Sequence, residues 1–260
     1  KYIAHYLLIN IMSKNKFIKG DIKVLNAWAF YDWANSVYPL VISSAVFPIY
    51  YGSLFVDDLY VELLGFNFKN TALISFLTAF AFVVLSFMTP LLSGIADYMG
   101  NKKKFLKFFC YSGSISCMGL YWFDLSNIYF GLFFYFTALI SFWASLVFYN
   151  SYLPDIAFKN QQDAISAKGY ALGYFGSVLL LVFNLAMVMY PETFGIIGDN
   201  SESIAMRYSF VSVGIWWIIF SQYTFYFLPA PNKKREIIKD VIWNGFNEII
   251  DVWNELKKIS

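Results

Sequence analysis

Histidine, cysteine and charge are all scarce in this chain of 260 residues. It has one histidine, His5, and two cysteines, Cys110 and Cys117, which lie in one apolar stretch and are most simply interpreted as small packing residues. No cluster of His, Cys and Asp has the spacing of a metal site, which excludes zinc chemistry, and we expect no cofactor. A nucleophile elbow and a phosphate-binding loop are also lacking, so an enzyme is a weak interpretation.

The shortage of charge indicates the class of protein. Charged residues make up 14% of the chain, whereas 59% of its residues are hydrophobic and 22% are aromatic. That composition is too apolar for an ordinary soluble domain and is typical of an integral membrane protein. We therefore expect a lipid bilayer around the chain and no nucleic-acid partner.

Charge-free runs mark the expected membrane spans, because a span needs about 20 mostly apolar residues and a central charge costs about 2.5 to 3.5 kcal/mol. The third run is short, but Lys107 can extend its side chain to the interface and lengthen it. The fold class predicted is all-α, with six transmembrane helices at Trp33 to Val56, Asn70 to Ala96, Phe108 to Phe123, Leu125 to Pro154, Gly169 to Pro191 and Tyr208 to Asn232.

The distribution of cations predicts the orientation of these helices. With the N-terminal segment placed in the cytoplasm, 17 of the 19 Lys and Arg residues fall on the inner side, and Lys69 and Arg207 fall outside. This bias follows the positive-inside rule and places both ends of the six-helix bundle in the cytoplasm.

The bundle divides the chain into three parts. Residues 1–25 form a cytoplasmic segment without the features of a cleaved secretory signal, in which Met12 is a candidate start. The six-helix bundle covers residues 26–230. Residues 231–260 contain an amphipathic helix expected to lie on the inner membrane surface, and we interpret its end as the truncation of a longer protein; a short natural tail is the alternative.

The first span carries polar side chains along one face. Helical spacing aligns Asp32, Asn35, Ser36, Pro39 and Ser43. A carboxylate in a span usually faces a protein interior or a water-filled cavity, because exposure to lipid is costly. We therefore predict that Asp32, Asn35 and Ser36 face a substrate cavity. The alternative is that Asp32 lies at the inner interface and only caps or anchors the helix.

The fourth span repeats this pattern with hydroxyl groups. Thr137, Ser141, Ser145 and Tyr149 recur every four residues in an otherwise aromatic helix. Two polar faces could share one cavity, so Ser141, Ser145 and Tyr149 join the predicted cavity lining. The alternative is that these hydroxyls bond to carbonyls of their own helix and act as small packing residues. The fifth span, with its repeated glycines, is interpreted as a packing helix, and the aromatic sixth span is expected to face lipid.

The turn between the second and third spans reads "PLLSGIADYMGNKKKFL". Asp97 ends one helix, Gly100 permits a tight reversal and Lys102 begins a run of three lysines. A carboxylate here could pair with a lysine or with the N-terminus of a neighbouring helix, and such a contact could break when helices move. We predict that Asp97, Gly100 and Lys102 form a conformational latch.

These motifs resemble the major facilitator superfamily, whose signature between helices 2 and 3 is G-x-L-A-D-R-x-G-R-K. Ala96, Asp97, Gly100 and Lys102 match it, whereas both loop arginines are replaced. Within that superfamily, "FYDWANSVYP", the turn above and "FYNSYLPDIA" followed by "SAKGYALGYFGS" are similar to the group related to the autophagy-linked vacuole effluxer. The similarity covers residues 26 to 230, the first half of a twelve-helix fold.

The resemblance implies a secondary transporter that works by alternating access and moves a small polar solute. Amino acids are the best-supported substrate class of the group, and protons are a candidate coupling ion. The missing C-terminal half or a second copy would complete the cavity, and the compact loops favour a bacterial inner membrane. Two alternatives remain open: a membrane scaffold or sensor that presents the amphipathic tail to partners, and an inactive fragment of a split transporter.

Overall fold

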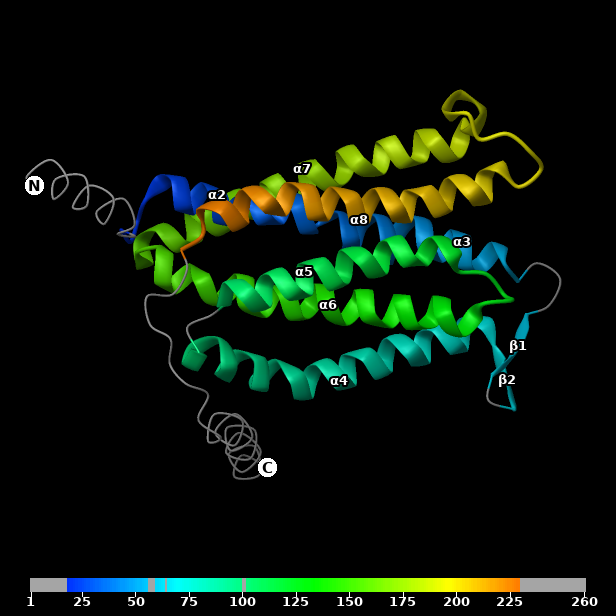
Figure 1. Ribbon diagram of the computed structural model, residues 1–260, viewed down its shortest axis with the longest axis horizontal. Helices are drawn as coiled ribbons and strands as arrows, with labels where there is room; N and C mark the ends of the chain where they lie inside the picture. Colours follow the sequence, from blue (N-terminus) through cyan, green and yellow to red (C-terminus); the bar gives the residue numbers. More distant parts are fainter. Residues whose placement is uncertain (1–17, 56–58, 64, 100–101, 230–260) are drawn as a thin grey trace, which may run out of the picture.

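A computed structural model describes residues 18–55, 59–63, 65–99 and 102–229, with no description of the side chains of residues 95–99. The helices run roughly parallel to one another; the first two follow one another in the same direction, and each later helix runs opposite to the one before it (Figure 1). They are α2 (Ile22–Asn35), α3 (Phe47–Ser53), α4 (Asn70–Met99), α5 (Lys102–Gly119), α6 (Ile128–Ile156), α7 (Lys159–Met189) and α8 (Ser201–Phe227). The predicted tail helix and the predicted start at Met12 lie outside the described residues.

Two prolines explain why the first long helix is not uniform. Between α2 and α3 lies a π-helical segment, η1 (Tyr38–Val46), with Pro39 near its start and Pro48 near the start of α3. Proline has no N–H and cannot make the bond to the carbonyl four residues earlier, so the hydrogen-bond ladder must change there. Within the segment, the Ser44 hydroxyl donates a hydrogen bond to the Pro39 carbonyl at 2.8 Å.

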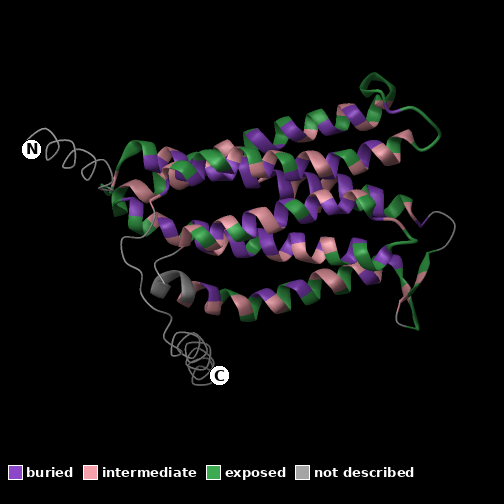
Figure 2. Cartoon of the chain, viewed as in Figure 1, coloured by how far each residue is buried: buried purple, intermediate pink, exposed green. Residues whose placement is uncertain are grey.

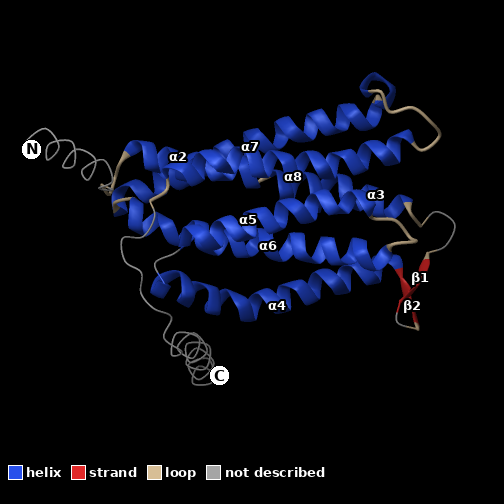
Figure 3. Cartoon of the chain, viewed as in Figure 1, coloured by secondary structure: helices blue, strands red, loops and turns tan. Residues whose placement is uncertain are grey.

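Short elements join the helices, and one of them was not predicted. The strands β1 (Tyr60–Leu63) and β2 (Phe66–Lys69) form an antiparallel hairpin that pairs Leu63 with Phe66, and Gly65 adopts φ +79° in its turn (Figure 3). The expectation of an all-α fold therefore misses this hairpin, whose four-residue strands are too short to show a pattern. Short 3-10 helices follow α5 and α7, at η2 (Leu120–Trp122) and η3 (Pro191–Phe194).

The C-terminal end of α6 meets the beginning and the end of the described chain. The Gly20 amide donates to the Ile156 carbonyl at 2.7 Å, and the Tyr152 hydroxyl donates to the Pro229 carbonyl at 3.3 Å. We call this side of the bundle the Pro154 end, and the opposite side, where β1 and β2 lie, the hairpin end.

Aromatic rings fill the space between the helices. Trp217 of α8 is fully buried and packs near Phe142 of α6 and Tyr38 of η1. The expectation that the sixth span faces lipid is therefore wrong for this residue. Near it, Gly113 of α5 allows close approach, because a Cβ there would lie 2.6 Å from Trp217 Cζ3.

Burial is uneven among the helices. Figure 2 shows α4 at one edge of the bundle with few buried residues along its length. Within the described residues, four helices are long and apolar enough to cross a membrane: 70–94, 128–156, 159–189 and 201–227. Four of the six predicted spans thus have a clear counterpart; the first is divided by η1, and α5 carries several lysines.

Replacing Gly113 with alanine should destabilise the bundle by about 1 to 3 kcal/mol, because the added methyl group would force the buried Trp217 ring to move. The measurement is the apparent melting temperature of the purified protein in detergent, which we expect to fall by several degrees. Gly52→Ala is the matched control, since no described atom lies within 4 Å of that Cβ. Equal melting temperatures for the two variants would contradict the packing described here.

Candidate functional site

A cavity of about 460 Å³ lies between α2, η1, α6 and α7. It combines one carboxylate, several amide and hydroxyl groups and a wall of aromatic rings. Its lining consists of Trp28, Asp32, Asn35, Ser36, Pro39, Leu40, Ser44, Phe142, Trp143, Leu146, Tyr149, Asn150, Ser166, Tyr170, Tyr174 and Ser177.

Asp32 lies in the last turn of α2, just before the π-helical segment, and is only 8% exposed. The Tyr149 hydroxyl of α6 donates a hydrogen bond to its Oδ2 atom at 2.9 Å. The cap of α2 is a different residue, Asp21, whose side chain accepts from the Lys23 amide at 2.8 Å. Asp32 therefore does not cap the helix, and its carboxylate is held at the cavity by a partner on another helix.

Trp28 fixes the position of Tyr149. Its indole Nε1 donates to the Tyr149 carbonyl at 2.9 Å, and the two rings stack with centroids 4.3 Å apart. Two glycines of α7 close the other side of the carboxylate: a Cβ at Gly169 would lie 2.5 Å from Asp32 Oδ2, and one at Gly173 would lie 2.5 Å from Ser36 Oγ. Small residues here let α7 approach the acidic face of α2.

Asn35 has unused hydrogen-bonding capacity. It is 1% exposed, and its Nδ2 group has no hydrogen-bond partner among the described residues. Its Oδ1 atom accepts a long bond of 3.4 Å from the Ser36 hydroxyl. Buried donors are usually paired, so an unpaired amide that lines a cavity is available to a ligand.

The cavity has a simple charge pattern. Among its described lining residues, Asp32 is the one acid, and none is Lys, Arg or His. The remaining surface is largely aromatic, with the rings of Trp28 and Tyr149 beside the carboxylate. A carboxylate near aromatic faces is suited to a cationic group, which both the charge and the rings attract.

The predicted cavity residues divide into two groups. Asp32, Asn35, Ser36 and Tyr149 line the cavity, whereas Ser141 and Ser145 do not. Ser141 donates to Ser112 of α5 at 3.1 Å, and Ser145 donates to the Phe142 carbonyl of its own helix at 2.8 Å. Of the three predicted hydroxyl residues of the fourth span, Tyr149 alone lines the cavity, and apolar residues of α6 such as Phe142 and Leu146 line the rest of that wall.

The π-helical segment accounts for another difference. The sequence pattern placed Ser43 on the polar face, but Ser44 lines the cavity. That pattern assumes 3.6 residues per turn, and a π-helix has more, so side chains beyond Pro39 are rotated relative to the expectation.

Helix α7 contributes residues to the cavity that were not predicted. Ser166, Tyr170, Tyr174 and Ser177 all line the cavity, and Tyr170 and Tyr174 are 68% and 72% exposed. Their spacing of four, four and three residues was visible in the sequence, but the glycines between them led to α7 being interpreted as a packing helix. The periodicity of these polar residues would have identified the same face.

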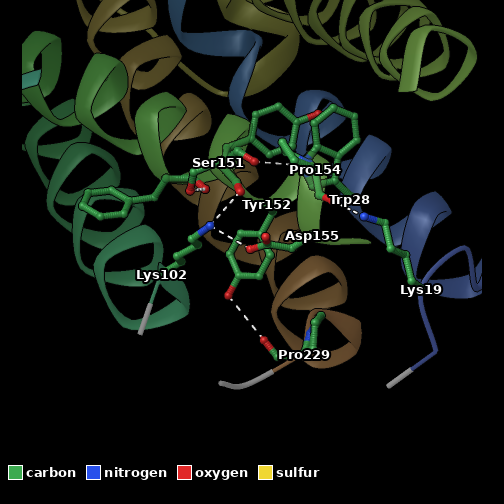
Figure 4. A network of polar contacts seen from close by, with 10 residues as sticks. Lys19, Trp28, Lys102, Ser151, Tyr152, Pro154, Asp155 and Pro229 are labelled. Carbon is green, nitrogen blue, oxygen red and sulfur yellow. Dashed lines mark hydrogen bonds and ion pairs between the residues drawn. The ribbon is translucent and has the colours of Figure 1, made fainter. Parts of the chain in front are cut away.

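Of the three residues predicted to form the latch, Lys102 is the one whose side chain the structure describes. Lys102 Nζ donates to Asp155 Oδ2 at 2.7 Å and to the Ser151 carbonyl at 2.8 Å (Figure 4). The contact joins the start of α5 to the end of α6. The side chain of Asp97 and the whole of Gly100 lie outside the described residues. Asp155 was missed as a site residue, although it closes the quoted motif "FYNSYLPDIA".

A second polar contact joins helices at the hairpin end. Arg207 Nε donates to the Tyr50 hydroxyl at 2.8 Å, and that hydroxyl donates to the Phe123 carbonyl. In the adjacent loop the Ser126 hydroxyl donates to Asp124 at 2.6 Å, which lowers the pKa of that carboxyl. The two ends of the bundle therefore each carry a cation that bridges two elements.

Comparisons with known proteins identify relatives of the chain. A family model described as "Vacuole effluxer Atg22 like" matches residues 21–163 and 158–260. The "Uncharacterized MFS-type transporter YxiO" of Bacillus subtilis (strain 168) is 33% identical over 205 residues, which cover 78% of this chain and 46% of the relative. An "Uncharacterized protein" of Aquifex aeolicus (strain VF5) is 27% identical over 187 residues, which cover 71% of this chain and 44% of that protein.

The chain thus spans about half the length of these curated relatives. No solved structure matches it significantly. The family match covers most of the described residues, and four described helices are long and apolar enough to cross a bilayer. The chain is a multi-pass membrane protein that belongs to the Atg22-like vacuole effluxer family, a group related to the major facilitators.

Proposed function

We propose that this chain is the six-helix N-terminal half of a secondary transporter that moves amino acids across a membrane by alternating access. The observation that carries the proposal is the cavity in which the buried Asp32, its Tyr149 partner and the unpaired amide of Asn35 meet. A carboxylate is retained inside a membrane bundle at considerable cost, and ligand or proton pathways are the usual reason.

The lengths of the helical segments support six spans. The rod formed by α2, η1 and α3 covers residues 22–53, roughly 48 Å at the rise of an α-helix, which exceeds a hydrocarbon core of about 30 Å. Together, α5 and η2 reach about 33 Å, and the lysines of α5 lie in its first two turns, where their side chains can extend to the interface.

The cations support an orientation. Lys102, Lys103, Lys104 and Lys107 lie near the Pro154 end, whereas Lys69 and Arg207 lie near the hairpin end. We therefore assign the Pro154 end to the cytoplasm. Since both relatives come from bacteria, the bacterial inner membrane is the proposed location.

The cavity offers complementary groups to a zwitterion. The ammonium group of an amino acid would bind Asp32 and face the rings of Trp28 and Tyr149, and its carboxylate would accept from Asn35 Nδ2. Asp32 and Asn35 are three residues apart on one helix, so their side chains share a face as the two ends of an α-amino acid require.

A second half would close the open side of the cavity. Large apolar side chains of α4 and α7 are exposed, among them Phe76, Phe80, Phe87, Phe175 and Val182. The relatives are about twice as long as the part that matches this chain, so their remaining residues could form such a half. A second copy of this chain is the alternative partner. Rocking of the two halves around the cavity would alternate access to it.

Asp32→Asn tests the carboxylate in the complete gene product reconstituted in vesicles. If Asp32 carries a coupling proton, the variant should lose the pH dependence of amino-acid transport while its protein level is unchanged. Asp163→Asn is the control, because Asp163 is exposed on α7 and does not line the cavity. A wild-type pH profile in the Asp32 variant would reject the proton role.

Asn35→Leu tests recognition of the substrate carboxylate. The KM for an amino acid should rise about 10 to 100 fold, as expected for loss of one hydrogen bond to a charged group, whereas a monoamine of the same shape should bind as before. The apparent melting temperature should not fall, because the Nδ2 group of Asn35 has no described partner to lose. Equal effects on the amino acid and the monoamine would contradict this assignment.

The Lys102 to Asp155 ion pair is proposed as the described part of the latch. Asp155→Lys would place two cations together and should lower the transport rate, roughly fivefold for a surface interaction of about 1 kcal/mol. The double variant Lys102→Asp and Asp155→Lys restores opposite charges and should recover most of that rate. If the double variant transports no faster than Asp155→Lys alone, the contact is not an electrostatic latch.

A further inference from the structure

A second hollow, separate from the substrate cavity, lies between α7 and α8 and has α2 as its floor. Its volume is about 430 Å³. It combines a short polar part with a longer aromatic part and is lined by Asn26, Phe30, Lys168, Leu172, Ile219, Phe220 and Tyr223. None of these residues lines the substrate cavity.

The polar part carries a cation. Lys168 Nζ donates to Asn26 Oδ1 at 2.7 Å, and an ammonium group has two further N–H donors. Lys168 is exposed, and so is Lys23, which lies one helical turn before Asn26 on the same face of α2. The carboxylate of Asp21 accepts from the Lys23 amide as the helix cap. Lys168 thus lines the hollow, and Lys23 adds a second positive charge one helical turn from Asn26.

The aromatic part continues deeper into the bundle. The Phe30 ring lies edge-on to Phe220 and Tyr223, with centroids 6.1 and 5.1 Å apart. Ile219 and Tyr223 remain 57% and 45% exposed, so the groove opens to the surroundings of the helices. In a membrane protein those surroundings are lipid.

The direction of the three helices orders these two parts along the membrane normal. The step from Asn26 to Phe30 on α2, from Lys168 to Leu172 on α7, and from Tyr223 back to Ile219 on α8 each leads from the Pro154 end toward the hairpin end. The cationic part therefore lies at the level of the headgroups and the aromatic part at the level of the acyl chains.

We propose that this groove binds an anionic phospholipid. Its phosphate would accept hydrogen bonds from Lys168 and be attracted by Lys23, and one acyl chain would lie on Phe30, Phe220 and Tyr223. A lipid with a net negative headgroup is favoured because no acid lines the groove among the described residues. The site is independent of the transported substrate.

Native mass spectrometry of the complete protein in detergent tests this site. The protein is titrated with phosphatidylglycerol and with phosphatidylcholine of the same acyl chains. We expect phosphatidylglycerol to bind about fivefold more tightly, the effect of roughly one lysine at a membrane surface. Lys168→Gln should weaken phosphatidylglycerol binding more than phosphatidylcholine binding and so remove this preference, whereas Phe30→Ala should weaken the binding of both lipids alike.

Lys104→Gln is the matched control, because Lys104 is an exposed lysine of α5 that does not line the groove. Equal binding of the two lipids by the wild-type protein, or equal effects of the two lysine substitutions, would overturn the proposal. A large excess of glycerol phosphate should not displace the lipid. Displacement would identify a site for a soluble phosphate and would also overturn it.

Discussion

The hydrogen bond between Tyr149 and Asp32 links α6 and α2, two of the helices that line the larger cavity. A buried carboxylate is tolerated only where other groups satisfy it, and Tyr149 does this from α6 at 2.9 Å. Trp28 holds Tyr149 by stacking and by a bond to its carbonyl, while Gly169 leaves room for the carboxylate beside α7. The Tyr149 bond and the Trp28 contacts therefore fix α6 against α2, and the small size of Gly169 lets α7 pack beside them.

The prolines of the first long helix shape the same cavity. They interrupt the hydrogen-bond ladder, and the π-helical segment between them turns Ser44 rather than Ser43 toward the cavity. Irregular backbone inside a membrane is tolerated where it lies within protein or lines a cavity, and Pro39 and Ser44 of this segment both line the cavity. The polar side chains and the irregular backbone of this first long helix thus both form part of the cavity wall.

Different polar contacts join the helices at each end of the bundle. At the Pro154 end, Lys102 joins α5 to α6, and Lys19 donates to the Pro154 carbonyl at 2.6 Å (Figure 4). At the hairpin end, Arg207 joins α8 to α3 through Tyr50. The Pro154 end carries most of the described lysines, whose ammonium groups can bind lipid headgroups as well as join helices.

The sequence by itself determined the helices and the polar face of α2, because charge-free length and helical periodicity are local properties. It also identified Asp32 and Tyr149 as cavity residues. Only the tertiary structure decided that Ser141 bonds to α5 and that Tyr170 and Tyr174 line the cavity. Helical periodicity shows which residues share a face of a helix, but it does not show which other helix or cavity that face contacts. The pairing of Lys102 with Asp155 across 53 positions was likewise invisible to a local pattern.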